Sequence, residues 1–424
     1  MAHLEGGRMA VIGIIATLDT KGKEAAFLRE QIESLGHNAL LIDSGMGFAP
    51  SVSPQVTREQ LFLAAGIEDY KDLLAKNGKA AAQDGMRKGL GIVLRSMQAE
   101  DRIQGVLAVG GAQGTAMATA AMQTLPIGFP KVMVSTVACG SALFGDYVGN
   151  RDITMIPSIA DICGLNSITI PVFSAGCGAV VGMAEAAELL KAKKAEKKPV
   201  IGLTMAGVTT PCVMRVKELL DSRGYETIVC HTNVVGSVVL NEMADRGELQ
   251  AMLDITPHEW GGFLFDGLLK SDSERLSAVY NSAIPVISLP GCVDVMLKGP
   301  YDQLSPELQQ RVHYAHTPFH THLRTTYEEM YAVGKLIAEK HKLCRGGNAI
   351  IIPAKGYSMQ NKEGAMFFDP YANSGFSDAV RDHAGENVKV IIGDYHINDP
   401  ACADDIVSQL EIFMREGSGN SEYL

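Results

Sequence analysis

Aromatic side chains and basic charge are both scarce in this sequence of 424 residues. Phe, Trp and Tyr make up 6% of it, with a single tryptophan, and the formal net charge is −11 at pH 7. A nucleic-acid platform normally presents a basic face. The lysine-rich segment at 191–198 is typical of a solvated helix end and linker. We therefore expect no nucleic acid among the partners.

Paired cysteines and long apolar stretches are also missing. The eight cysteines are spread along the chain and form no C-x-x-C pair, which is typical of a reducing compartment. The first residues contain neither the apolar core nor the cleavage site of a signal peptide. No stretch approaches the roughly 20 apolar residues of a membrane span. The sequence thus predicts a cytoplasmic protein that does not bind a membrane.

Glycine, by contrast, is abundant. The chain has 44 glycines and 46% hydrophobic residues, and this composition indicates many junctions between strands, loops and helices, as in α/β enzymes. A chain of 424 residues is longer than one hydrophobic core usually supports. Two domains are therefore expected.

Two segments repeat the same order of elements. Residues 11–43 and residues 200–233 each contain a buried strand, a polar turn, an amphipathic helix, a glycine and a second strand, and both open with Val-Ile-Gly. Each predicts a β-α-β unit with parallel strands. Further strands are expected within 103–111, 131–141, 153–158 and 168–172 in the first half, and within 260–267, 284–295, 348–354 and 388–396 in the second.

The predicted fold class follows from this pattern. It is α/β, with two Rossmann-like, doubly wound domains whose parallel sheets are related by an internal repeat. The boundary is expected where the lysine-rich helix end meets Pro199, giving domains at 1–197 and 198–424. Ligands bind beyond the carboxyl ends of the strands in such sheets, and two domains facing each other would form a cleft.

One loop of the first half suits a phosphate. Gly110, Gly111, Gly114 and Thr115 lie where a buried strand gives way to a helix. Glycine lets the backbone come close to a ligand, and the start of a helix leaves N–H groups unpaired for an anion. The sequence GGAQGT matches neither the Walker form nor a full G-x-G-x-x-G fingerprint. Taken alone, it fits a bare strand-to-helix turn as well.

Two more loops at the same predicted sheet edge carry polar residues. They are Asp19, Thr20, Lys21 and Gly22 after the first strand, and Ser135 and Thr136 after a later one. Thr20 can cap the following helix, whereas Lys21 in its first turn opposes the helix dipole unless an anion lies alongside. A solvent-facing lysine is the alternative. Together the three loops favour a phosphate more than any one of them does.

A histidine-rich segment stands out in the second half. His316 and His320 have the spacing of two metal ligands on one helical face. Pro318 lies between them and disfavours a regular helix, and the segment offers no carboxylate ligand, so no metal site is expected. Polar contacts at a domain or cleft surface explain the segment, and substrate binding through His316 and Arg324 is the alternative. Arg324 is the better ligand for an anion, because its planar guanidinium can bind two oxygens.

Later strands in the second half also end in polar residues. Lys355 follows one strand, and His396 lies between Asp394 and Asp399 at the end of another. A histidine between carboxylates can act as a general base, although turn formation by Asn, Asp and Pro explains much of the same composition. Arg324, Lys355 and His396 are therefore the candidate catalytic residues.

A pair of cysteines supports a different hypothesis. Cys139 and Cys292 occupy equivalent loops of the two repeated halves, which is where a two-base racemase of the aspartate/glutamate type places its two thiols. Each thiol would have to become a thiolate with help from its surroundings. Packing of small residues explains both positions as well, and those racemases have much shorter domains.

The motifs as a set resemble a known family. ATLDTKG, GGAQGTAMAT, SIADICGLN, LPGCVDVMLKGP, HTPFHTHLRTT, PAKGYS, FFDPYAN and HINDP are similar, in order and spacing, to those of a largely uncharacterised bacterial and fungal family. Its plant relatives include the N-terminal inhibitory domain of the tomato mosaic virus resistance protein. The resemblance covers roughly residues 9–414. It implies an ATP-binding protein of two Rossmann-like domains that forms dimers.

Together these observations predict a cytoplasmic ATP-binding protein. The phosphates of ATP, with Mg²⁺, would lie near the loop from Gly110 to Thr115, faced by Lys21 and by hydroxyls of the neighbouring loops. We expect an enzyme that couples ATP to the modification of a small acidic metabolite in the interdomain cleft, and a homodimer or larger assembly. A nucleotide sensor or scaffold without turnover is one alternative, and the two-cysteine racemase, which needs no cofactor, is another.

Overall fold

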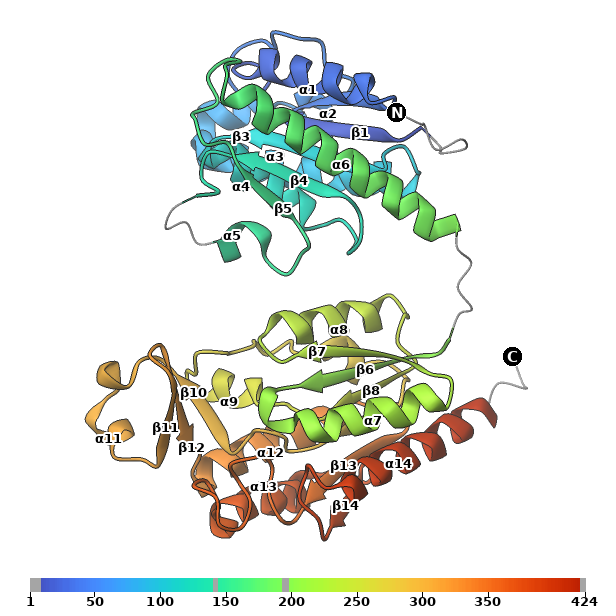
Figure 1. Cartoon of the computed structure of the whole chain (residues 1–424), viewed down its shortest axis with the longest axis vertical. Coiled ribbons are helices and arrows are strands. Elements are labelled where there is room, and N and C mark those ends of the chain that lie inside the picture. The colour runs from blue at the N-terminus through green and yellow to red at the C-terminus, as the bar shows by residue number, and fades with distance from the viewer. Residues whose placement is uncertain (1–8, 140–143, 193–197, 420–424) are drawn as a thin grey trace. The chain divides into compact units, whose positions relative to one another are not determined.

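The chain folds into two α/β units. The computed structural model describes residues 9–139, 144–192 and 198–419, and packing divides the chain into Met1–Ala195 and Glu196–Leu424. In Figure 1 the first unit runs from blue to green and the second from yellow-green to red. The predicted boundary at 197–198 is next to this division, and Lys197 itself lies outside the described residues.

The first unit is built on a five-stranded parallel sheet with the order β2-β1-β3-β4-β5. Its strands are β1 (Val11–Ala16), β2 (Asn38–Asp43), β3 (Gly105–Gly110), β4 (Lys131–Ser135) and β5 (Thr154–Pro157). Its helices are α1 (Gly22–Ser34), α2 (Arg58–Ala64), α3 (Tyr70–Ala99), α4 (Ala112–Met122), α5 (Phe144–Val148) and α6 (Thr169–Ala192). Helices α1 and α6 pack in the core on one face of the sheet, and α2, α3 and α4 pack in the core on the other (Figure 1).

The hydrophobic pattern explains these elements. β1 and β3 are apolar along almost their whole length and are buried on both faces, as central parallel strands are. Helix α1 buries Ala25, Leu28 and Ile32, a spacing that places them on one face of the helix. The β-α-β unit predicted at 11–43 is confirmed, with Val11 paired to Asn38 and Ala16 to Asp43 in parallel register.

The second unit contains a six-stranded parallel sheet with the order β14-β13-β9-β8-β6-β7 and a separate three-stranded antiparallel sheet with the order β10-β12-β11. The strands are β6 (Val200–Met205), β7 (Glu226–His231), β8 (Ala251–Asp254), β9 (Val286–Ser288), β10 (Val295–Lys298), β11 (His313–Thr317), β12 (His320–Arg324), β13 (Asn348–Pro353) and β14 (Lys389–Gly393).

The helical elements of this unit include two short 3-10 turns. Most of the helices cover the two faces of the parallel sheet, and η2 and α11 lie between β10 and β11 of the antiparallel sheet. They are η1 (Gly207–Thr209), α7 (Thr210–Ser222), α8 (Val235–Asp245), α9 (Glu259–Leu264), α10 (Ser277–Tyr280), η2 (Tyr301–Gln303), α11 (Pro306–Gln309), α12 (Tyr327–His341), α13 (Pro370–His383) and α14 (Pro400–Gly419). Both parallel sheets place their first strand between the second and third. The internal repeat and the Rossmann-like fold class are thus confirmed.

Two predicted strands are wrong. Residues 260–267 form most of α9 and the turn after it, and the strand of the sheet lies earlier, at β8. Residues 168–172 form the start of α6. The side-chain oxygen of Asn166 accepts hydrogen bonds from the N–H groups of Ile168 and Thr169 and so caps this helix. Pro171 fits the first turn, where its missing N–H is no loss.

Helix α6 also departs from the expectation of no membrane-length apolar stretch. Residues Thr169–Lys191 are long and apolar enough to cross a membrane, by length and composition only. The helix lies along the sheet (Figure 1) and buries Phe173, Cys177, Val180 and Ala184 in the core. One face of α6 thus packs on the sheet, as a helix of an α/β domain does.

Candidate functional site at the switch point of the first sheet

The first sheet reverses its strand order between β1 and β3. β1 connects through α1 to β2 on one side, and β3 connects through α4 to β4 on the other. The loops after β1 and β3 therefore diverge toward opposite faces of the sheet. Open α/β sheets bind ligands in the crevice that such a topological switch point creates beyond the carboxyl ends of the strands.

A cavity of ≈ 570 Å³ lies at this switch point, and small-molecule sites are typically of about 300–1,000 Å³. Its walls come from the loops after β1 and β2, the start of α4 and one stretch of α3. The lining residues are Thr17, Asp19, Thr20, Ser44, Met46, Gly47, Leu74, Lys79, Gly111, Ala112, Gln113, Gly114 and Met117.

The start of α4 presents unpaired backbone donors to this cavity. Gly111 is the N-cap and supplies no side-chain cap. Within the described part of the chain, the N–H groups of Ala112, Gln113 and Gly114 have no hydrogen-bond acceptor. These donors and the positive end of the helix dipole favour an anion.

The glycines of this loop differ in what the fold requires of them. A Cβ atom at Gly110 would lie 3.0 Å from the Cα of Gly114, so a side chain there would press on the backbone of the first turn of α4. A Cβ at Gly111 would find its nearest neighbour 3.7 Å away, and one at Gly114 would find it 3.9 Å away. Neither has a positive φ. The fold therefore has room for a side chain at both positions, and their lack of one leaves the backbone open to a ligand.

A lysine that the sequence analysis did not single out lines the cavity. Helix α3 is interrupted at Gly78, whose φ of 79° and ψ of 179° are essentially restricted to glycine. Lys79 follows the kink, begins the second helical stretch and has an exposed side chain. In the described part of the chain this ammonium group makes no ion pair, so it is available to an anionic ligand.

Asp19 and Thr20, two of the predicted nucleotide-binding residues, line the cavity. Oδ2 of Asp19 accepts a hydrogen bond from the N–H of Gly47 (2.9 Å), which ties the loop after β1 to the loop after β2. The hydroxyl groups of Thr17 and Thr20 lie 2.9 Å apart. Carboxylate and hydroxyl oxygens beside a phosphate site are suitable ligands for Mg²⁺, which is usually bound through one or two carboxylates and the substrate phosphates.

The predicted hydroxyl donors of α4 and of the end of β4 lie outside the cavity. Thr115 and Ser135 are fully buried, and their hydroxyl groups bond to each other (2.7 Å). Ser135 Oγ also accepts from the N–H of Val137 (3.1 Å). The half-buried Thr136 donates its N–H to the carbonyl of Gly110 (3.3 Å). These contacts join the first turn of α4 to the end of β4 and position the glycine loop; none of the hydroxyl groups lines the cavity.

Lys21 and Gly22 lie on the other flank of the β1–α1 loop. They line a second cavity, of ≈ 620 Å³, which also borders Asp19 and Thr20. The ammonium group of Lys21 donates to the carbonyl of Ile162 (2.5 Å). A Cβ at Gly22 would lie 2.0 Å from Oγ of Ser51, so a side chain there would displace this hydroxyl from its hydrogen bond to the carbonyl of Leu18.

Arg324, the first of the candidate catalytic residues, is an internal cross-link. It is 6% exposed, and its N–H groups donate to protein atoms, which include the carbonyl of Phe367 (2.7 Å) and Oδ1 of Asn373 (2.6 Å). The guanidinium thereby joins β12 to the segment before α13 and to α13 itself, and it presents no free fork to a substrate.

His396 and Lys355 are also held by protein groups. The two ring nitrogens of His396 contact the carbonyl of Ser358 (2.9 Å) and the N–H of Asn398 (3.1 Å). Lys355 is exposed and pairs with Asp394 (3.1 Å). His396 is therefore part of a turn structure, the alternative that its composition suggested.

The histidine-rich segment is a β-hairpin, formed by β11 and β12, and the rings of His316 and His322 stack at 4.8 Å. Pro318 lies in its turn, which explains the absence of the helix that the spacing of His316 and His320 would require. No group of three or more His, Cys, Asp or Glu side chains in the described residues has the arrangement of a metal site.

The two cysteines of the racemase hypothesis have unequal surroundings. Cys139 is exposed, whereas Cys292 is buried. Burial, with the nearby charge of Asp294, raises the pKa of the Cys292 thiol well above its usual range. This environment works against the thiolate that proton abstraction would need.

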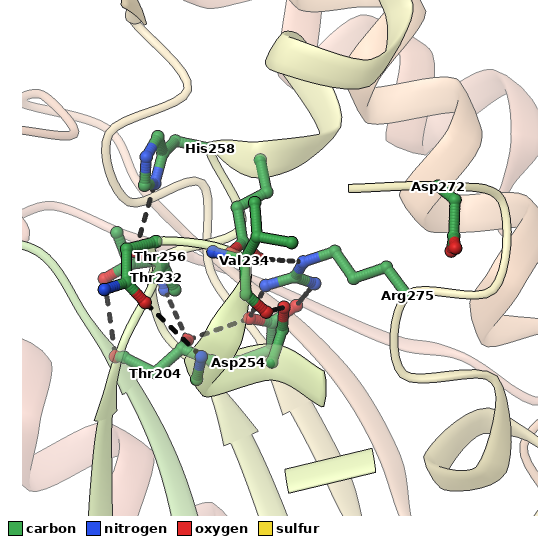
Figure 2. Close-up of polar contacts among 12 residues, drawn as sticks. Thr204, Thr232, Val234, Asp254, Thr256, His258, Asp272 and Arg275 are labelled. Atoms are coloured by element: carbon green, nitrogen blue, oxygen red, sulfur yellow. Dashed lines mark hydrogen bonds and ion pairs between the residues drawn. The ribbon is translucent and has the colours of Figure 1, made fainter. Parts of the chain in front are cut away.

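The equivalent switch point of the second sheet carries a buried ionic network. Figure 2 shows the Arg275 guanidinium between Asp254, at the end of β8, and neighbouring loops. Arg275 bonds both oxygens of Asp254 (2.6 and 2.9 Å) and Oε2 of Glu259 (2.6 Å). Thr204 donates to Asp254 and accepts from the N–H of Thr256. Although burial acts to lower it, these carboxylates raise the pKa of Arg275. The sequence analysis did not predict this network, whose partners are far apart in sequence.

Two parallel-sheet units with the same strand order around a switch point define a two-domain Rossmann-like protein. The chain belongs to the uncharacterised protein family UPF0261, whose N-terminal domain matches residues 10–189 and whose C-terminal domain matches residues 198–414.

Relatives are found in bacteria and in tomato. A UPF0261 protein of Clostridium tetani is 33% identical over 406 residues, which cover 94% of this chain and 98% of that protein. The ToMV resistance protein Tm-1(GCR237) of Solanum lycopersicum is 36% identical over 334 residues, 77% of this chain and 44% of that protein. The ToMV susceptible protein tm-1(GCR26) of the same plant is 32% identical over 424 residues, 95% of this chain and 56% of that protein.

Among solved structures, UDP-GlcNAc 2-epimerase of Methanocaldococcus jannaschii is 11% identical with a TM-score of 0.22, covering 66% of this chain and 83% of that chain. Glycosyltransferase SsfS6 of a Streptomyces species is 13% identical with a TM-score of 0.17, covering 66% of this chain and 82% of that chain. These likenesses are too weak to carry an argument about function.

Proposed function

We propose that the first unit binds ATP, with its phosphates at the start of α4. The observation that carries this proposal is the set of unpaired N–H groups at Ala112, Gln113 and Gly114, which line a cavity at the switch point of the sheet. A phosphate chain is the ligand that such donors and a helix dipole favour most. The resemblance to the tomato mosaic virus resistance family supports the same ligand.

The neighbouring residues have complementary roles in this proposal. Lys79, which lines the same cavity as the glycine loop, neutralises phosphate charge in place of Lys21, which lines the other cavity. Asp19 and Thr20 offer oxygen ligands to the Mg²⁺ that accompanies ATP. Thr115 and Ser135 hold the start of α4 in position through their mutual hydrogen bond.

We further propose that ATP is used to modify a small acidic metabolite. Positioning and charge neutralisation supply most of the catalysis in phosphoryl transfer, so the reaction makes little demand on protein acids or bases. Among the described residues that line the cavity, Asp19 is the one carboxylate and histidine is absent. The protein would act in the cytoplasm as a homodimer, which light scattering after gel filtration tests.

A thermal-shift titration tests the nucleotide site. Purified protein is titrated with ATP, ADP and NAD, each with and without Mg²⁺, because a ligand that binds only the folded state raises the melting temperature with its concentration. We expect ATP with Mg²⁺ to give the largest shift. Gly114→Ala places a methyl group where the phosphates approach, and Lys79→Ala removes a charge; both should reduce the shift.

Lys88→Ala is the matched control, since this lysine is exposed on the same helix and lines neither cavity. A full ATP shift in Gly114→Ala, or no shift in the wild type at millimolar nucleotide, would contradict the proposal. Steady release of phosphate when a second substrate is added would separate an ATP-dependent enzyme from a nucleotide sensor.

A further inference from the structure

The second cavity, on the α1 side of the β1–α1 loop, has the composition of a binding site in its own right. It measures ≈ 620 Å³ and is bordered by the first turn of α1 and by the segment between β5 and α6. Its lining residues are Asp19, Thr20, Lys21, Gly22, Lys23, Glu24, Ser51, Asp161, Ile162, Cys163 and Gly164. Lysines and carboxylates are both present among them.

One part of the wall attracts negative charge. Lys21 is the N-cap of α1 and supplies no side-chain cap. Within the described residues, the N–H groups of Gly22, Lys23 and Glu24 have no acceptor. The Lys21 ammonium uses one hydrogen on the carbonyl of Ile162, which leaves its other donors free.

Another part of the wall attracts positive charge. The side chain of Glu24 is 3% exposed, and its Oε1 accepts from the N–H of Gly164 (2.6 Å). Its Oε2 makes no hydrogen bond in the described part of the chain. Asp161 also lines the cavity; its side chain is exposed, and its Oδ1 accepts from the N–H of Ile162 (2.9 Å). Glu24 is a largely buried carboxylate that lines the cavity with one oxygen free of protein partners, so this oxygen can accept from a donor or pair with a cation in the cavity.

We propose that this cavity binds a free α-amino acid. A ligand with negative charge alone would be repelled by Glu24 and Asp161. A ligand with positive charge alone would be repelled by Lys21, Lys23 and the positive end of α1. A zwitterion satisfies both sets: its carboxylate binds the α1 N–H groups and Lys21, and its ammonium group binds the free oxygen of Glu24.

This assignment deepens the proposed function, since it names the small acid, and it rests on that function only for the role of substrate. Asp19 and Thr20 border both cavities, so the amino acid would lie across one loop from the phosphates of ATP. Amino-acid binding itself can be measured on the protein without nucleotide.

The test is a thermal-shift screen of the full chain without nucleotide. Each of the protein amino acids is added singly at about 10 mM, a concentration that reveals weak folded-state binding. We expect at least one to raise the melting temperature, and calorimetry then gives its affinity. The N-acetyl derivative, which lacks the ammonium group, and the amide, which lacks the carboxylate, should each bind about ten-fold more weakly or not at all.

Variants locate the site. Glu24→Gln and Asp161→Asn should weaken amino-acid binding and leave the ATP shift unchanged, whereas Gly114→Ala should do the reverse. Glu30→Gln, on the exposed face of α1, is the control. Asp161 is exposed, so its variant keeps the test valid if Glu24→Gln fails to fold. The assignment is overturned if no amino acid shifts the wild type, if the derivatives bind as tightly, or if neither variant weakens binding. An ATP shift alongside any of these results would leave the nucleotide proposal standing.

Discussion

Asp43 and Arg58 form a buried ion pair, and Asp43 directly precedes Ser44, which lines the proposed nucleotide cavity. Nε of Arg58 donates to Oδ2 of Asp43 (2.7 Å), and both side chains are almost fully buried. The other oxygen of Asp43 accepts from the N–H groups of Leu18 (3.1 Å) and Gly45 (2.9 Å). One carboxylate therefore holds the loop after β1 and the loop after β2 together.

Replacing Arg58 with methionine should destabilise the first unit. The change leaves the Asp43 carboxylate buried without its cation, and breaking a buried pair in this way typically costs about 3–5 kcal/mol. Urea unfolding followed by hydrogen exchange of peptides from 9–139 measures the effect in this unit. Unchanged protection of the loops around Leu18 and Gly45 would show that the pair does not support them.

Gly110 and Gly114 should respond in opposite ways to alanine. At Gly114 the methyl group fits, and alanine in place of a helical glycine gains up to about 1 kcal/mol. At Gly110 the methyl group would press on the Cα of Gly114, so the melting temperature should fall. Denaturant midpoints of the two variants without nucleotide measure this difference, and equal midpoints would contradict the packing described for the loop.

Gly78→Ala tests the kink in α3. The φ of 79° disfavours any side chain although a Cβ there would meet no atom within 4 Å, so the penalty of about 1–3 kcal/mol is one of backbone strain. Gly66→Ala is the matched control, because Gly66 has φ +81° and the same open surroundings. Both variants should lose stability, but only Gly78→Ala should weaken ATP binding, since it displaces Lys79. Isothermal calorimetry with ATP separates the two.

His341 should make the second unit less stable in acid. Burial lowers the pKa of this histidine to about 4, whereas an unfolded histidine titrates near 6.5. The unfolded chain thus binds the extra proton first. The contribution of His341 to the free energy of unfolding, about 3 kcal/mol, is fully present above pH 6.5 and is lost as the pH falls to about 4. The His341→Gln variant should show a shallower loss over this range; parallel stability curves for the two proteins would exclude His341 as the cause.

Much of the fold could be predicted from periodicity. The apolar runs at 11–16 and 200–205 are each followed by an amphipathic helix, and they form inner strands of the two sheets. The apolar segments at 168–172 and 260–267 misled, because a buried helix and a buried strand share a short apolar run. Asn166 and Pro171 were the local signals of a helix start at α6.

The candidate site was predictable in part. The glycine loop and Asp19 lie where the strand ends placed them, since the topology of a doubly wound sheet fixes its crevice. Lys79 lines the cavity because it follows the kink at Gly78, far from the glycine loop in sequence. No local sequence pattern predicts the direction of its side chain. Tertiary contacts also decide on which side of the β1–α1 loop Lys21 lies, and they supply the acceptors that bind the N–H groups of Arg324.

Asp19 and Thr20 form a wall common to both cavities, and this has a thermodynamic consequence. A ligand that fixes the β1–α1 loop on one flank would also set its geometry on the other, and occupancy of the two cavities would then be linked. Linkage is reciprocal: an amino acid that tightens ATP about ten-fold must itself be held about ten-fold more tightly by the ATP-loaded protein. Through this one short loop, each ligand would thus change the affinity of the protein for the other.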